Sequence, residues 1–243
     1  MLGSRGISAN FAGAALEKFQ ELVSRTFVKT ELGALGERGP IPLQQSAKLM
    51  VTGVTRGSFG FVLDELSDQT EIADTALKSM VEEVASLIER TASPNELEFE
   101  QVAETLDVRT LTALKDFFVT LDSGKATFRL VEGIVDFTFD ASSIYRARQR
   151  TEATSIKEKE DDIMGILDGF LPDHRKFEAR AGNSHVIYGS VSKEAAEQYR
   201  AFISSGETPI GKRWKLKIQR RFIKRLNRPT QEVNRLLRFL EQE

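Results

Sequence analysis

The chain contains no cysteine, only two histidines and a single tryptophan among its 243 residues. Without cysteine there can be no disulfide, no thiolate nucleophile and no zinc site built on thiolates. The two histidines, His174 and His185, cannot close a structural metal site by themselves. We therefore expect neither a bound metal nor a cofactor.

Long apolar runs are missing as well. No stretch approaches the roughly 20 residues that cross a membrane, and the opening MLGSRGISANF lacks the apolar region of a signal peptide. These absences predict a cytoplasmic protein with no membrane partner. The hydrophobic content of 40% and charged content of 29% are ordinary for a globular protein. A chain of 243 residues allows one large domain or two smaller ones.

Residues 47–65 predict a β-hairpin around which the first half of the chain is organised. Its arms alternate apolar and polar residues, and Arg56-Gly57-Ser58 lies between them as the turn. A two-stranded ribbon is marginally stable alone, so its apolar face needs covering helices. Residues 125–140 predict a second hairpin, and the two could pair into one four-stranded sheet.

Apolar residues at three- and four-residue steps predict the covering helices. We expect Ser93 to cap one of them, with Pro94 at its first position and Glu96 at its third. Asp107 should cap another, and Gly124 should end it in the left-handed conformation. The predicted helices span residues 8–30, 71–91, 93–106 and 107–123.

The character of the sequence changes after residue 140. Residues 141–160 carry many charges and few apolar side chains, which predicts a solvated linker helix. Five short strand patterns and one helix follow, which is typical of a small barrel. The sequence thus predicts an α+β fold with a helix-covered antiparallel sheet (residues 1–140), a charged linker helix (141–160) and a small OB- or SH3-like β-barrel (161–243). The barrel strands are expected at residues 162–170, 176–181, 184–191 and 212–223, with a helix at 193–203. Residues 233–240 fit either a helix or a strand, and a strand that closes the sheet is favoured.

The net charge is −2, but acids dominate residues 58–107 and bases dominate residues 212–228. In the basic segment Trp214, Leu216 and Ile218 should face the barrel core, so cations face outward. A strand with cations about 7 Å apart can follow a phosphate backbone, and Tyr188 is the candidate for stacking on bases. The predicted nucleic-acid-binding residues are Lys212, Arg213, Lys215, Lys217, Arg220, Arg221, Lys224 and Arg225. The rival interpretations are that this strip is a solvated face, or that it docks the acidic region of the first domain or of a second copy.

Enzyme motifs are largely missing. Phosphate-binding and nucleophile-elbow motifs do not occur, and the glycines near residue 36 do not follow a strand. His174 could act as an acid or base and Asp161-Asp162 could hold a cation, although a surface histidine and solvated acids are the simpler interpretation. In the first hairpin, Arg56 and Ser58 could bind an anion, although a purely structural turn is favoured.

Two stretches resemble known proteins. Residues 7–65, a helix and a loop followed by R-G-S-F-G-F, and residues 162–191, with MGILDGFLP and VIYG, are similar to uncharacterised bacterial proteins that carry a C-terminal small β-barrel module. The resemblance implies no activity, although some such proteins lie near mobile elements or antiviral defence genes. Our leading hypothesis is a non-enzymatic binding or assembly module of a bacterial complex, self-associating or bound to a protein partner, with nucleic acid as the partner if the basic strip is exposed. An enzyme of unrecognised type with a site near His174 and Asp161, and a purely structural self-associating protein, are the alternatives.

Overall fold

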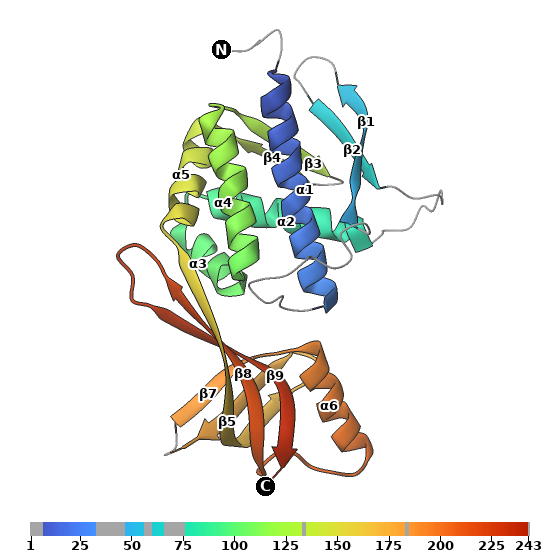
Figure 1. The fold of residues 1–243 in the computed structure, drawn as a ribbon, viewed down its shortest axis with the longest axis vertical. Coiled ribbons are helices and arrows are strands. Elements are labelled where there is room, and N and C mark those ends of the chain that lie inside the picture. The colour runs from blue at the N-terminus through green and yellow to red at the C-terminus, as the bar shows by residue number, and fades with distance from the viewer. Residues whose placement is uncertain are drawn as a thin grey trace. The chain divides into compact units, whose positions relative to one another are not determined.

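The computed structural model describes residues 7–32, 47–55, 60–65, 76–132, 135–182 and 185–242. The chain divides into two compact units, residues 1–153 and 154–243, which are described here one at a time. Figure 1 shows the helices of the first unit and the strands and single helix of the second. The predicted α+β fold with a small β-barrel at the C-terminal end is confirmed.

Helices build the core of the first unit. Phe117 and Phe118 are at most 1% exposed, and the ring of Phe117 lies 6.1 Å from that of Phe19 and 5.6 Å from that of Phe128. The helices that carry Phe19 and Phe117 and the strand that carries Phe128 therefore share one apolar core. The helices are α1 (Ala9–Leu32), α2 (Ala76–Ala92), α3 (Glu96–Thr105), α4 (Val108–Ser123) and α5 (Ala141–Glu152).

Two helix boundaries differ from prediction. Asn95, not Ser93, caps α3 by accepting the N–H of Leu97 at 3.1 Å, and Ser93 accepts the N–H of Asn95 instead. Pro94 therefore precedes the helix. At the end of α4, Gly124 has φ −79, and the left-handed residue is Lys125 with φ 47. A Cβ at position 124 would overlap the ring of Phe11 on α1, so a larger residue there would require that ring to move.

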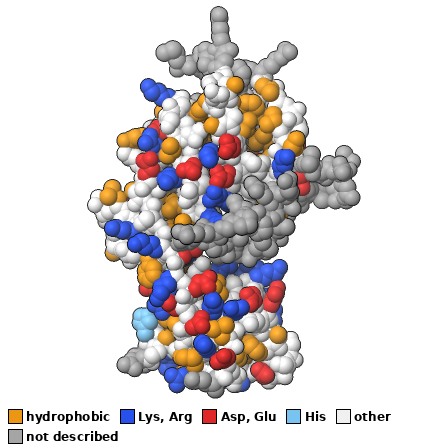
Figure 2. Space-filling view, viewed as in Figure 1, with side chains coloured by type: hydrophobic (Ala, Val, Ile, Leu, Met, Phe, Trp, Pro, Cys, Tyr) orange, Lys and Arg blue, Asp and Glu red, His pale blue; other side chains and the backbone are white. Residues whose placement is uncertain are grey.

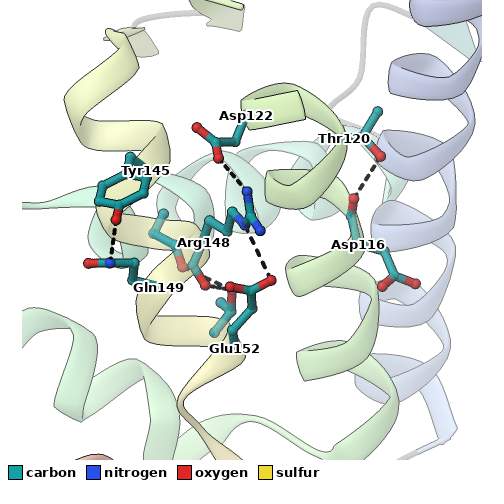
Figure 3. A network of polar contacts seen from close by, with 9 residues as sticks. Asp116, Thr120, Asp122, Tyr145, Arg148, Gln149 and Glu152 are labelled. Carbon is teal, nitrogen blue, oxygen red and sulfur yellow. Dashed lines mark hydrogen bonds and ion pairs between the residues drawn. The ribbon is translucent and has the colours of Figure 1, made fainter. Parts of the chain in front are cut away.

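Polar contacts from α5 connect it to its neighbouring helices. Arg150 donates to the carbonyls of Thr91 (2.9 Å) and Ser93 (2.6 Å), where the end of α2 leaves carbonyl groups without helical partners. On another face of α5, Arg148 lies between Asp122 of α4, at 2.6 Å, and Glu152, at 3.2 Å (Figure 3). Helix α5 thus belongs to the first unit. It ends at Glu152, so the prediction that a linker helix continues to residue 160 is wrong.

The two predicted hairpins form separate two-stranded sheets, β1 (Leu49–Thr55) with β2 (Gly60–Glu65) and β3 (Phe128–Glu132) with β4 (Val135–Phe139). Their expected pairing into one four-stranded sheet does not occur among the described residues. Helices bury Leu130 and Phe139 of the second hairpin, whereas Val51 of the first hairpin is 50% exposed. The first hairpin is instead hydrogen-bonded to α1 through Gln20, whose side-chain amide donates to the carbonyl of Ala47 (2.6 Å) and accepts the N–H of Leu49 (2.7 Å).

Five strands close the barrel of the second unit in the order β5-β6-β7-β9-β8. The β7–β9 pair is parallel and the others are antiparallel, and α6 (Lys193–Ser204) lies between β7 and β8 in the chain. This is the strand order of an OB-fold. The strands are β5 (Ser155–Leu171), β6 (Lys176–Ala181), β7 (His185–Val191), β8 (Arg213–Lys224) and β9 (Gln231–Gln242).

Strand β5 is much longer than the segment predicted for it. It has 17 residues; its second part pairs with β6, and its first part, from Ser155 to Ile166, pairs with β8. Residues 155–160, predicted as helix, are thus the start of this strand. The first parts of β5 and β9 and the second part of β8 form a three-stranded extension of the barrel, which we call the ribbon (residues 155–164, 217–224 and 231–234).

Apolar side chains from every barrel strand and from α6 fill the barrel. Phe170 stacks on Tyr199 of α6 with ring centroids 4.1 Å apart, and the ring of Trp214 lies 5.2 Å from that of Phe239. Gln198 of α6 fixes β9 in the way that Gln20 fixes β1, accepting the N–H of Phe239 at 2.8 Å and donating to its carbonyl at 3.1 Å. The helix therefore packs against the barrel core.

Closure of the barrel between β7 and β9 requires a glycine at position 189, because a Cβ there would overlap the carbonyl oxygen of Asn234. We predict that Gly189→Ala lowers the free energy of unfolding by about 1–3 kcal/mol, as overpacking does. Gly169→Ala is the matched control, since its Cβ would meet Glu178 at an ordinary 3.7 Å. Urea denaturation measures both variants, and equal stabilities would contradict the prediction.

The cap of α5 makes a prediction about pH. The backbone N–H of Ser143, followed by the hydroxyls of Ser142 and Ser143, lowers the pKa of Asp140 to about 2. A carboxyl whose pKa is lowered by folding stabilises the protein above its unfolded pKa, and this contribution is lost as pH falls toward 2. Asp140→Asn should therefore flatten the decline of stability across that acid range. An NMR titration that gave Asp140 an ordinary pKa would contradict this.

Candidate nucleic-acid interface

The predicted basic strip lies on β8 and alternates as expected from Arg213 to Ile218, after which the buried side chains are those of Gln219, Arg221 and Ile223. Trp214, Leu216 and Ile218 are at most 4% exposed, and the Trp214 indole N–H donates to the carbonyl of Pro209 at 3.1 Å. These three residues belong to the barrel core, as predicted. The cations between them therefore point away from that core.

Carboxylates of the neighbouring strand face the middle of the strip. Glu158, Glu160 and Asp162 alternate along β5 and share one face, and the register places Arg221, Gln219 and Lys217 opposite them. The ion pairs run diagonally across this register: Lys217 to Glu160 at 3.1 Å and Lys215 to Asp162 at 4.0 Å. On the other face, Arg220 lies 3.5 Å from Asp161 and 3.8 Å from Glu232. The charge of the strip is thus balanced along this part of the ribbon.

Strand β5 has no carboxylate between its start at Ser155 and Glu158. Register pairs Lys224 with Ser155, so no carboxylate of β5 lies opposite the last residue of β8, and Glu232 of β9 lies opposite Phe222. Lys157, Lys224 and Arg228 are all exposed here. We call this region the ribbon end (Lys157 and residues 224–228). Exposed basic side chains are therefore concentrated at this end of the ribbon.

A tight turn forms the tip of the ribbon end. The N–H of Arg228 donates to the carbonyl of Arg225 at 3.4 Å, and Asn227 takes a positive φ of 56. Leu226, at the outer corner of this turn, is 72% exposed. Arg225 is half-buried and donates to the side chain of Gln231 at 3.1 Å, so Lys224 and Arg228 are the exposed cations on the two sides of Leu226.

The eight predicted residues therefore divide into three groups. Lys215, Lys217 and Arg220 have carboxylate partners on the ribbon, and Arg221 is buried at 9% exposure. Lys212 is half-buried and Arg213 exposed, at the opposite end of β8 from the turn. Lys224 and Arg225 belong to the ribbon end. Sequence reasoning missed Lys157 because it was assigned to a helix.

A second exposed surface lies on β6 and β7. Tyr188 is 73% exposed and lies directly opposite Glu178, while Val186 is 46% exposed opposite Arg180. Two nitrogens of the Arg180 guanidinium, Nε and Nη2, donate to Asp168 at 2.6 and 2.7 Å, and this contact lowers the pKa of Asp168. The surface presents an aromatic ring, with carboxylates beside its cations.

The remaining sequence candidates do not come together. Arg56 and Ser58 lie outside the described residues. His174 is exposed in the turn after the end of β5, whereas Asp161 lies in the first part of β5 and contacts Lys159 and Arg220. Among the described residues, no three His, Asp or Glu side chains are grouped so as to hold a metal ion. Figure 2 shows acidic and basic side chains interspersed on the face of this unit that it presents.

No family model, curated protein or solved structure matches the chain. The resemblance to uncharacterised bacterial proteins therefore stays a prediction. None of the helices in the described ranges is long and apolar enough to cross a membrane.

The ion pairs of the ribbon should balance charge rather than stabilise the fold. For Lys217 and Glu160, whose side chains are 27% and 51% exposed, a double-mutant cycle to alanine should give a coupling of about 0.2–1 kcal/mol. Added salt should reduce it by screening. Arg129 and Asp136, an exposed cross-strand pair of the first unit, serve as the comparison. A coupling above about 2 kcal/mol would mean that the charges are desolvated, contrary to this view.

Proposed function

We propose that the second unit is a nucleic-acid-binding module that contacts the phosphate backbone through the ribbon end. The observation that carries the proposal is the position of two exposed lysines at one end of the ribbon. Carboxylates accompany the basic strip along β5, and the exposed Lys157 and Lys224 lie beyond the last of them on that strand. Phosphate binding draws its free energy largely from releasing counterions, so cations that already face carboxylates contribute less to it.

The strand order supports the same class of function by analogy. Barrels with this order often bind oligonucleotides, and their loops between the first two and the last two strands take part. Here the last two strands, β8 and β9, are joined by the turn of the ribbon end. Fold analogy alone does not establish function. Here it indicates the same β8–β9 turn as the distribution of charge does.

A second candidate is single-strand binding on the β6–β7 surface, favoured by the 73% exposure of Tyr188. Base stacking on an aromatic ring contributes about 1–3 kcal/mol per base. The carboxylates of Glu178 and Asp168 beside this ring oppose a phosphate backbone. We therefore rank this surface second.

The proposal predicts a salt-dependent affinity that the ribbon end controls. The double variant Lys224→Ala and Arg228→Ala should weaken binding to all sequences alike and reduce the slope of log affinity against log salt by about two. Fluorescence anisotropy with a labelled duplex and its separated strand, from about 50 to 200 mM salt, measures both quantities. Lys193→Ala removes an exposed cation from α6 and is the charge control.

A companion variant locates the contact. Glu160→Gln with Asp162→Asn would remove the carboxylates facing Lys217 and Lys215. Residue 160 is five residues from Ser155, the strand partner of Lys224, about 16 Å along a strand, which is two Debye lengths at physiological salt. We expect little change in affinity if the ribbon end is the contact and a clear gain if the middle of the strip is. Loss of binding in Tyr188→Ala but not in the ribbon-end variant would favour the second candidate.

The wider setting of the module rests on sequence. We propose a non-enzymatic component of a cytoplasmic bacterial complex, either self-associating or bound to a protein partner, with a connection to mobile elements or antiviral defence. Light scattering of the full chain over a range of concentrations tests self-association. A mass equal to one chain throughout would remove that part of the proposal.

A further inference from the structure

One face of the ribbon carries an aromatic side chain among basic ones. The register places Phe222 of β8 directly between Lys157 of β5 and Glu232 of β9. Directly paired residues lie on the same face of a sheet, and residues two apart along a strand do so as well. Lys224 and Lys159 therefore share the face of Phe222. We call this surface the Phe222 face (residues 157, 159, 220, 222, 224 and 232).

The Phe222 ring lies outside the barrel core. Ile218, four residues earlier on β8 and on the same side of the strand, is fully buried in that core together with its partner Leu236 of β9. Phe222 is only partly buried, because the ribbon extends beyond the barrel at this point. Part of its aromatic surface is therefore open to a ligand.

Charge is unequally divided around this ring. Lys157 and Lys224 are exposed, and neither forms an ion pair within the described part of the chain. Glu232, on the β9 side, lies 3.8 Å from Arg220, which also lies 3.5 Å from Asp161. A phosphate group is therefore attracted to the side of the ring that carries the two lysines, away from the carboxylate of β9.

We infer that the Phe222 face binds single-stranded nucleic acid, with a base stacked on the Phe222 ring and the adjoining phosphates contacted by Lys157 and Lys224. The inference rests on the proposed function and names its substrate class. The bases of a duplex are covered by their neighbours, whereas unpaired bases can stack on aromatic side chains of a sheet. The Cβ atoms of Lys157 and Phe222 are about 5 Å apart in such a pair, and Lys224 lies about 7 Å further along the strand. Both ammonium groups are thus within a side-chain length of a base on the ring.

Stacking makes a prediction that phosphate contacts do not. The protein should bind a single strand more tightly than an abasic strand of the same length and charge. Phe222→Leu should abolish that difference and weaken binding to the intact strand about tenfold, which lies in the lower half of the range for a base stacked on an aromatic ring. The slope of log affinity against log salt should stay unchanged, because no cation is lost.

Fluorescence anisotropy with labelled strands measures these affinities, and urea denaturation checks that each variant is folded. Phe222→Tyr keeps the ring and should retain the preference for the intact strand. Tyr188→Ala, which removes the exposed ring of the β6–β7 surface, should behave as the unaltered protein.

Equal affinity of the unaltered protein for the intact and the abasic strand would overturn the inference without any variant. If Phe222→Leu binds the intact strand as the unaltered protein does while Lys157→Ala with Lys224→Ala does not, stacking is wrong and the phosphate contact stands. If Tyr188→Ala loses the preference instead, the base stacks on the β6–β7 surface. If the unaltered protein binds neither duplex nor single strand, the proposed function itself fails.

Discussion

The pairing of β5 with β8 is the interaction on which the second unit depends. Twelve consecutive residue pairs join the two strands, from Ser155 opposite Lys224 to Ile166 opposite Arg213. Because β5 continues past this ladder to pair with β6, one strand belongs both to the barrel and to the ribbon. A slip of one residue between β5 and β8 would turn Leu216 and Ile218 out of the core. The apolar alternation therefore fixes the register, and the register fixes which charges meet.

Charge follows from that register. The segment Lys157-Glu158-Lys159-Glu160 alternates in sign at every residue, so a strand conformation separates its acids and bases onto opposite faces. The acidic face meets the cations of β8, and the remaining cations gather where β5 starts. Surface pairs of this kind contribute little stability each. Their main effect is to place positive charge at one end of the ribbon rather than along its whole length.

The sequence contained enough information for most elements of the fold. The alternation around Trp214 and the cap at Asp107 predicted elements that the structure contains. The start of β5 was misassigned because charges spaced along a solvated helix and charges alternating along a strand look alike when only composition is considered. The sign alternation of residues 157–160 is the signal that would have separated them. It would also have assigned Lys157 to the candidate site.

Other features depend on contacts that no local pattern contains. The close approaches to Gly124 and Gly189 are made by Phe11 and by Asn234, which are distant in sequence. The ion-pair partners of Lys215 and Lys217 are likewise about 50 residues away on β5, so their neutralisation follows from strand pairing and not from the strip itself. Sequence reasoning could find the cations but could not tell balanced ones from unbalanced ones.

Gln20 and Gln198 have a consequence for how their helices are held. Each side-chain amide substitutes for one rung of a β-ladder, bonding through both its N–H and its oxygen to the backbone of a strand. Apolar packing has no strong directional preference and would tolerate several azimuths of a helix about its own axis. Rotating the helix about its axis by the angle between successive residues, about 100°, would move the glutamine amide away from the strand. One glutamine in each unit thus fixes the rotation of its helix about the helix axis, which apolar packing alone would leave variable.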